Sequence, residues 1–246
     1  MSTVSDPTGP VPVRADSPPH GAVRSRSRAW PLWASAAGVL ALVGTIVFDA
    51  RPAAETEAWL NGEDYLVTAS DVLTVDAVAN RLGWTAGLLA VAALLVFQAV
   101  WRRAVDDRYT SVAGKVVSAS VVATAAAGLL GYGWKGALGN YLGPEAGMYD
   151  EDGLFIYYIL TDFGAYLPWF AMVVAAFAVA WMAFVDRLVS RILGTVSALF
   201  AVGLAALTFG TGVPGLPATL MPIWLIVLGV WLAVGRSRIT RSETGR

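Results

Sequence analysis

Six stretches of this 246-residue sequence are apolar over 18 or 19 residues each and are separated by polar or basic segments. A helix rises about 1.5 Å per residue, so each run approaches the ~30 Å thickness of the hydrocarbon core of a bilayer. Hydrophobic residues make up 57% of the chain and charged residues 14%, far from the soluble average. We therefore expect an all-α, polytopic membrane helix bundle with six transmembrane helices. The expected spans are about 31–48, 83–101, 116–134, 168–185, 192–209 and 217–235.

The distribution of basic residues predicts the orientation of these spans. Fourteen of the 17 Lys and Arg residues lie in the N-terminal tail, the second and fourth connections and the C-terminal tail. Cytoplasmic loops carry an excess of such residues, so both termini are expected in the cytoplasm and the protein in the cell membrane. Twelve of the 18 acidic residues then lie outside, in the loops 49–82 and 135–167.

Outside the six-span domain, 30–236, two polar tails are expected. Residues 1–29 are rich in Pro, Ser and Arg and poor in large apolar residues, which is typical of a disordered tail. Residues 237–246 form a second, cytoplasmic tail. The small residues after Phe48 would also suit a cleaved signal peptide, but the apolar run before them is longer than such peptides use, which favours a retained anchor.

Local signals predict structure at four further places. Pro52 and Gly62 bracket a short run with start and stop signals for a small helix, and the spacing of Val72, Val75, Ala79 and Leu82 suggests a surface helix leading into the second span. Pro168 lacks an N–H and predicts a break before the fourth span. In the third span, small residues recur every fourth position, as a close-packing ridge or as general Ala richness: Ala119, Ala123, Ala127 and Gly131.

The composition excludes several classes of function. Cys is absent, which removes disulfides, thiolate metal sites and cysteine nucleophiles. The single His lies in the Pro-rich tail, so bis-His haem, His-ligated zinc and a Ser/His triad are excluded within one chain. The net charge of −1 predicts no nucleic-acid partner. No cofactor and no catalytic residue is predicted.

The segment 135–167 contains the densest collection of potentially functional side chains. Lys135 and Asp162 flank it at similar expected depth, so they could pair or orient a solute, although Lys135 could instead extend toward the interface past Trp134. Its tyrosines could line an aromatic pocket, with interfacial anchoring as the alternative. The predicted ligand-binding residues are Lys135, Tyr141, Tyr149, Tyr158, Asp162 and Tyr166.

Three adjacent acidic residues, Asp150, Glu151 and Asp152, followed by Gly153, offer hard oxygen ligands for a divalent metal. They lack the spacing of an EF-hand loop, and a solvated acidic loop is the simpler interpretation. Ionisable residues are missing from the middle of every expected span, which lowers the expectation of an ion-driven transporter.

Several features together resemble a bacterial, actinobacterial-type family of six-span integral membrane proteins of unknown function. They are the long acidic first loop, Arg81-Leu82-Gly83, Arg191-Ile192-Leu193-Gly194, the Pro-rich turn before the sixth span and the segment Trp231 to Arg236. The resemblance covers roughly residues 30–236 and implies the six-span architecture, without an activity or site residues.

Three functional hypotheses follow from the sequence. The first is a non-enzymatic membrane protein, surrounded by the lipid bilayer, whose acidic, aromatic outer loops contact a ligand, a membrane-protein partner or a second copy of the chain. The second is a small-solute permease, with a path near the Gly/Pro breaks of spans three, four and six. The third is a membrane-embedded enzyme that uses the loop carboxylates with a divalent metal.

Overall fold

The computed structural model describes residues 29–235 and 237–240, and every regular element within them is a helix. The tails expected at 1–29 and 237–246 lie largely outside the described residues. The α-helices are α1 (Leu32–Leu42), α2 (Ala53–Asn61), α3 (Ala77–Trp101), α4 (Val112–Tyr141), α5 (Glu151–Gly164), α6 (Phe170–Phe184), α7 (Arg191–Thr211) and α8 (Pro217–Val234). Shorter turns are the π-helices η1 (Val43–Val47) and η3 (Arg102–Asp106) and the 3₁₀-helices η2 (Ala69–Thr74), η4 (Leu167–Trp169) and η5 (Arg238–Thr240).

Five helical stretches are long and apolar enough to cross a membrane: Ala77–Asp106, Val112–Tyr141, Glu151–Phe184, Arg191–Thr211 and Pro217–Val234. The expected first span corresponds to a shorter apolar helix, Leu32–Val47. The length and composition of these helices are those of a multi-pass membrane protein.

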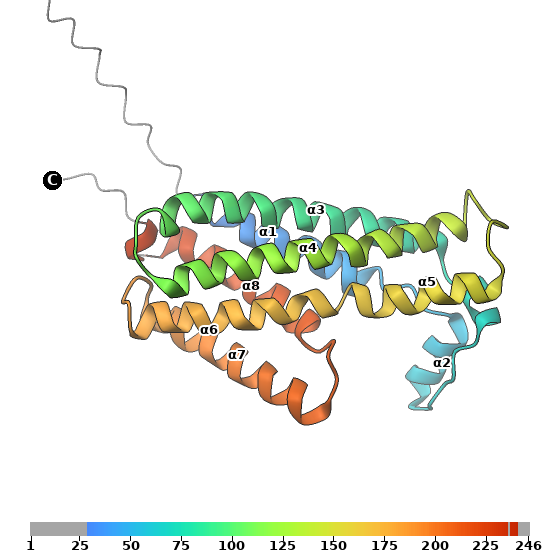
Figure 1. Cartoon of the computed structure of the whole chain (residues 1–246). Helices are drawn as coiled ribbons and strands as arrows, with labels where there is room; N and C mark the ends of the chain where they lie inside the picture. The colour runs from blue at the N-terminus through green and yellow to red at the C-terminus, as the bar shows by residue number, and fades with distance from the viewer. Residues whose placement is uncertain (1–28, 236, 241–246) are drawn as a thin grey trace, which may run out of the picture.

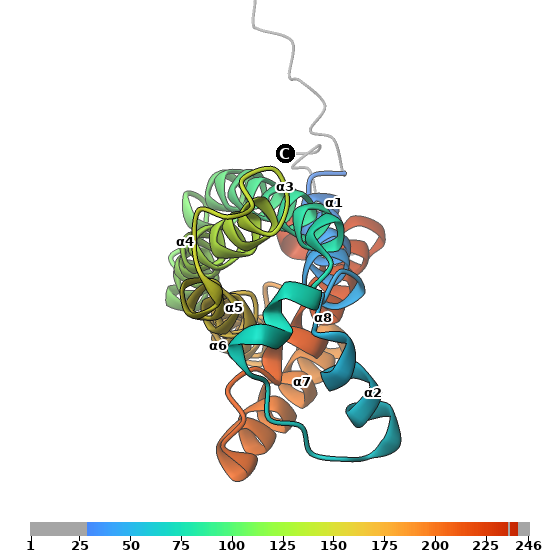
Figure 2. The same cartoon turned by 90° about the vertical axis from the view of Figure 1, so that its right-hand side faces the viewer.

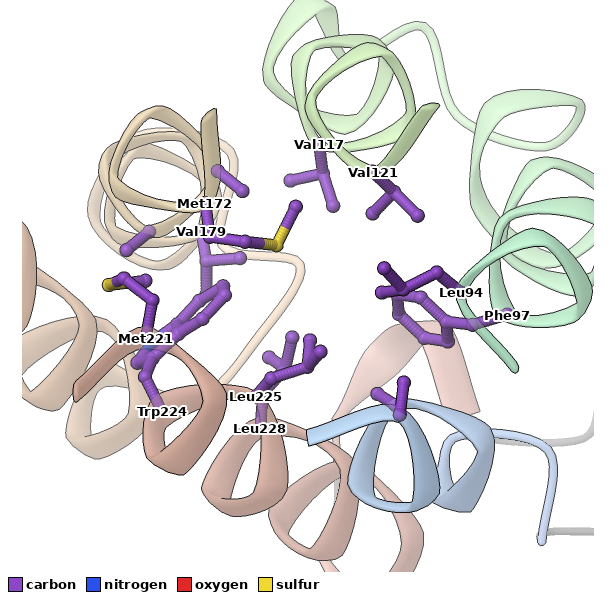
Figure 3. Packing of buried hydrophobic residues seen from close by; sticks show 14 of the residues in the cluster. Leu94, Phe97, Val117, Val121, Met172, Val179, Met221, Trp224, Leu225 and Leu228 are labelled. Atoms are coloured by element: carbon purple, nitrogen blue, oxygen red, sulfur yellow. The ribbon is translucent and has the colours of Figure 1, made fainter. Parts of the chain in front are cut away.

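The helices form an elongated bundle in which α3, α4 and the in-line pair α5 and α6 run along most of its length (Figure 1). Helix α1 packs between α8 and α3, and α7 packs mainly on α6 and diverges from the rest (Figures 1 and 2). Buried side chains from α3, α4, α6 and α8 meet in the centre, among them Phe97, Val121, Met172 and Trp224 (Figure 3). The core is therefore apolar where these four helices meet.

Small residues bring α1 and α8 into close contact. A Cβ added to Gly38 would lie 2.4 Å from the Pro222 carbonyl oxygen, and one added to Gly229 would lie 2.3 Å from the Ser35 hydroxyl. That hydroxyl donates to the Ile226 carbonyl at 3.0 Å. Close backbone approach with an inter-helix hydrogen bond is the usual packing of membrane helices, where apolar surface alone gives no preference for protein over lipid.

The ridge expected in the third span does not pack as a unit. Ala119, Ala123 and Ala127 are exposed on α4, and only Gly131 is buried. The buried face of α4 instead carries Ser120, Thr124, Gly128 and Gly131, among other residues. The fourfold spacing of small residues therefore reflects general Ala richness in the first three positions.

Two helices extend beyond the expected spans. Helix α4 continues to Tyr141, past the expected end of the third span at 134, and Glu151–Gly164 is helix α5, so most of the segment 135–167 is helical. Helix α3 starts at Ala77, where the Asp76 carboxylate accepts from the N–H groups of Val78 and Ala79. The residues expected to form a separate surface helix belong partly to η2 and partly to the start of α3.

Two local predictions are confirmed. Helix α2 begins after Pro52 and ends at Gly62, whose φ of 72° lies in the left-handed region that glycine adopts without strain. The Pro168 break appears as η4, which separates α5 from α6. At this break the Thr124 hydroxyl donates to the Pro168 carbonyl at 3.1 Å, so a side chain of α4 binds the junction between α5 and α6.

The two ends of the bundle differ in charge. The ring centroid of Trp30 lies 6.1 Å from that of Phe97 and 6.2 Å from that of Trp101. The Tyr109 hydroxyl donates to the backbone carbonyl of Arg238, so both ends of the described chain lie near the end of α3. The opposite end carries α2, η2 and α5 (Figure 1). Among the described residues, Arg102, Arg103 and Arg108 lie in or after η3 at the first of these ends, whereas Asp49, Glu55 and Asp162 lie at the α2 end.

Candidate functional site

At the α2 end, Arg51 binds three carboxylates with its three guanidinium nitrogens. Nε donates to Asp49 at 2.9 Å, Nη1 to Glu55 at 2.7 Å and Nη2 to Asp162 at 2.9 Å. Asp49 and Arg51 belong to the connection after η1, Glu55 to α2 and Asp162 to α5. One side chain therefore joins the first connection to a helix more than 100 residues later in the sequence.

Two tyrosines complete this cluster, Tyr158 of α5 and Tyr166 of the connection between α5 and α6. The Tyr158 hydroxyl donates to the second oxygen of Glu55 at 2.6 Å, and the Tyr166 hydroxyl donates to Asp49 at 2.9 Å. Burial alone would lower the pKa of Arg51, but the carboxylates, Asp49 foremost, more than offset it and raise that pKa above its ordinary value. We call Asp49, Arg51, Glu55, Tyr158, Asp162 and Tyr166 the arginine cluster. Its carboxylates outnumber its single guanidinium, so it is negative overall.

A second polar contact lies under η1. Lys135 of α4 is only 2% exposed, and its Nζ donates to the Gly44 carbonyl at 2.9 Å. A Cβ on Gly83 would lie 2.6 Å from Cε of Lys135, so that glycine leaves the space through which the lysine reaches η1. Lys135 also interacts electrostatically with Asp49. Lys135 therefore links α4 to the π-helix η1, which directly precedes the arginine cluster in the chain.

The tyrosine one turn earlier on α4 supports the same turn. Tyr132 is 2% exposed, and its hydroxyl is 2.7 Å from that of Thr45 in η1. The ring lies against Gly87 of α3, where an added Cβ would be 2.1 Å from a ring carbon. The extra residue per turn of a π-helix is thus held by two α4 side chains, and π-turns of this kind are often found at functional sites.

An open cavity of about 670 Å³ adjoins the arginine cluster, within the range of small-molecule sites. Four carboxylates and one guanidinium lie on its wall, together with the aromatic rings of Trp59 and Tyr65. Trp59 is 77% exposed, so its ring is accessible to a ligand. The lining residues are Ile46, Asp49, Arg51, Glu55, Thr56, Trp59, Glu63, Asp64 and Tyr65. We call this cavity the acidic pocket.

The six residues predicted to bind a ligand do not form one site. Asp162 pairs with Arg51 instead of Lys135, and Lys135 neither pairs with Asp162 nor reaches toward the interface, because it is buried against Gly44. Tyr158 and Tyr166 join the arginine cluster. The remaining two, Tyr141 and Tyr149, form a packing cluster with Tyr157, in which the three rings meet edge-on or tilted at centroid distances of 4.7 to 5.7 Å.

The predicted metal ligands lie at the start of α5. Asp150 is its N-cap and accepts from the Gly153 N–H at 2.9 Å, while Glu151 and Asp152 occupy the first turn and are exposed. Acidic residues at this position stabilise the helix through its dipole. Within 29–235 and 237–240, no group of three or more His, Asp or Glu side chains is arranged to hold a metal ion.

Sequence reasoning missed Asp49, Arg51 and Glu55 as members of a site. One signal was available: Arg51 is one of only two basic residues in the segment 49–82, which contains seven acidic ones. A lone cation among carboxylates suggests an ion-pair centre, although the sequence does not say which carboxylates it binds. Comparison of the chain with protein-family models, with curated proteins and with solved structures finds no significant match.

Proposed function

We propose that this chain is a six-span protein of the cell membrane, with both termini in the cytoplasm, that binds a small organic cation in its acidic pocket on the outer side. The observation that carries the ligand class is the composition of the pocket wall. Four carboxylates and one guanidinium lie on the wall, and each nitrogen of that guanidinium already donates to a carboxylate of the arginine cluster. The rest of the proposal is the membrane arrangement that puts this pocket outside the cell.

The six-span arrangement is supported by the five long apolar helices and by the 16-residue apolar stretch Leu32–Val47. Sixteen helical residues span about 24 Å, which tilting or local thinning of the bilayer accommodates. Six crossings put the two ends of the chain on one side, which agrees with their common position in the bundle. The excess of Lys and Arg at that end favours the cytoplasm.

The absence of Cys makes the orientation directly testable. Asp64→Cys lies on the acidic pocket and is expected to react with a membrane-impermeant maleimide in intact cells. Asp107→Cys lies in the connection after η3 and is expected to react only after the membrane is opened. Labelling of Asp107→Cys in intact cells would contradict the orientation, and labelling of neither position until lysis would place the acidic pocket inside.

The charge and the aromatic rings of the acidic pocket favour a cation over an anion. An anion would meet four carboxylates, and the nitrogens of Arg51 already donate to two of these, Asp49 and Glu55, and to Asp162 beside the pocket. A cation gains from the same potential and from contact with the faces of Trp59 and Tyr65. A quaternary or primary ammonium of modest size combines both kinds of contact.

Binding is tested with choline, tetramethylammonium and putrescine on the purified full chain, by isothermal titration calorimetry in detergent. Trp59→Ala removes an exposed ring from the pocket and is expected to weaken binding of the best probe by roughly three- to tenfold, the usual size of one cation–π contact. Leu60→Ala is the matched control, because Leu60 is 71% exposed and does not line the pocket. Equal effects of the two substitutions, or no binding of any probe, would refute the proposal.

A further inference from the structure

Among the described residues, three basic side chains lie toward the α2 end of the bundle, and two of them are bound by groups of the protein. Arg51 binds three carboxylates, and Lys135 is buried against the Gly44 carbonyl. The side chain of Arg81, in the second turn of α3, has no hydrogen bond or ion pair to any residue that the structure describes. Its guanidinium therefore keeps all its donors available for a group outside the protein.

Arg81 lines a groove of about 370 Å³ between α3 and α4, together with Trp84, Gly133, Gly136, Ala137 and Asn140. The Asn140 side chain likewise has no hydrogen bond to the described part of the chain. Nothing lies within 4 Å of the position where a Cβ on Gly133 would stand, so this glycine leaves the groove open. At Gly136 the missing Cβ has another role, because it allows the Trp84 ring to lie on α4.

The groove lies where the apolar surface of the bundle begins. Arg81 directly precedes the uncharged run 82–101 of α3. One turn from Gly133 on α4, Leu129 and Leu130 are 54% and 60% exposed, as expected for side chains that face lipid. Trp84 is 37% exposed beside Arg81, and tryptophan is enriched at the level of lipid head groups. Polar donors thus stand directly above a surface suited to acyl chains.

We infer that this groove binds the phosphate group of an anionic phospholipid. Arg81 presents a planar fork of N–H donors, which matches phosphate oxygens, and the Asn140 amide can add a further donor. The acyl chains of the same lipid would follow the exposed leucines of α4. A free phosphate would gain only the polar contacts and none of the contacts with acyl chains, so the lipid is the favoured source of the phosphate.

The test titrates the purified full chain in a non-ionic detergent with dioleoyl phosphatidylglycerol and measures bound lipid by native mass spectrometry. Arg81→Gln keeps the Cγ that lies near Gly139 and removes the charge. It is expected to weaken the tightest lipid site about tenfold, the loss typical of a charge-assisted hydrogen bond. Arg103→Gln, which removes an exposed arginine at the other end of α3, is expected to change that site less than about twofold. Equal losses in the two variants would overturn the inference.

A second pair of variants tests the groove without altering charge. Gly133→Leu fills the open space and is expected to weaken lipid binding by a factor similar to Arg81→Gln. Gly203→Leu is its control, because Gly203 is also exposed on a helix and also has nothing within 4 Å. Unchanged binding in Gly133→Leu would overturn the inference. Equally tight binding of dioleoylglycerol, or displacement of the lipid by glycerol phosphate, would overturn it as well.

Discussion

The closest backbone approach among the glycines of this bundle joins α4 to the end of α5. A Cβ added to Gly131 would lie 1.8 Å from the carbonyl oxygen of Gly164 and 2.2 Å from its carbonyl carbon. Ordinary contact for a Cβ begins near 3.4 Å, so Gly131→Ala requires the helices to separate by about 1.6 Å. Both clashing atoms belong to the backbone, and no rotamer change relieves the contact.

The expected cost of Gly131→Ala is about 2 kcal/mol, the middle of the range for overpacked interiors. For a chain of this size that corresponds to a thermal midpoint about 4–8 °C lower. Gly164 lies between Asp162 and Tyr166, so the separation also strains the arginine cluster. We therefore expect the loss of stability to be accompanied by weaker binding in the acidic pocket.

Gly133→Ala provides the matched control for this prediction. It stands two residues further along the same helix, and nothing lies within 4 Å of its added Cβ. Alanine is the better helix former by about 1 kcal/mol, so this variant is expected to be as stable as the wild type or more so. The measurement is the thermal unfolding of both variants in the same detergent, followed by intrinsic tryptophan fluorescence. A Gly131→Ala midpoint equal to or above that of Gly133→Ala would refute the packing argument.

Three further predictions concern polar contacts. Arg51→Gln is expected to lower the thermal midpoint by several degrees, because it leaves three carboxylates facing one another. Tyr166→Phe is expected to lower the midpoint by less. Equal midpoints for Arg51→Gln and the wild type would show that the cluster does not hold the bundle together. Lys135→Glu is expected to destabilise the chain by about 3–5 kcal/mol, because it buries an anion against the Gly44 carbonyl. Lys135→Met is expected to be tolerated. Similar thermal midpoints of these two variants in detergent would contradict the prediction. Hydrogen bonds from the Thr68 hydroxyl and N–H lower the pKa of the Asp71 carboxyl in the folded chain. The stability that these bonds contribute is therefore present above the carboxyl pKa of the unfolded chain, about 4, and is lost as the pH falls through the lower pKa of the folded chain. The stability difference between the wild type and Asp71→Asn should therefore be constant near neutral pH and shrink in acid, and a difference that grows on acidification would contradict this sign.

The sequence by itself determined the features that depend on local free energies. Apolar runs of bilayer length make membrane helices favourable wherever they occur. Five of the six expected spans therefore appear as long apolar helices, and the first expected span appears as the shorter helix Leu32–Val47. Pro168 interrupts its helix because proline lacks an N–H, and Gly62 ends α2 because glycine tolerates a positive φ. Each of these outcomes depends on a few neighbouring residues.

Only the tertiary structure decided which polar groups meet. The partners of Arg51 include Asp162, 111 residues away, and Lys135 finds a backbone carbonyl 91 residues earlier. These choices depend on the close packing that glycines allow at particular crossings, and the fourfold spacing of small residues on α4 did not reveal which face would pack. The last turns of α4, up to Tyr141, are likewise held by tertiary contacts, because Leu138 packs with Val72 and Leu154 and Lys135 binds the Gly44 carbonyl. Spans follow from composition along the chain, whereas the candidate sites follow from the order in which the helices are packed around one another.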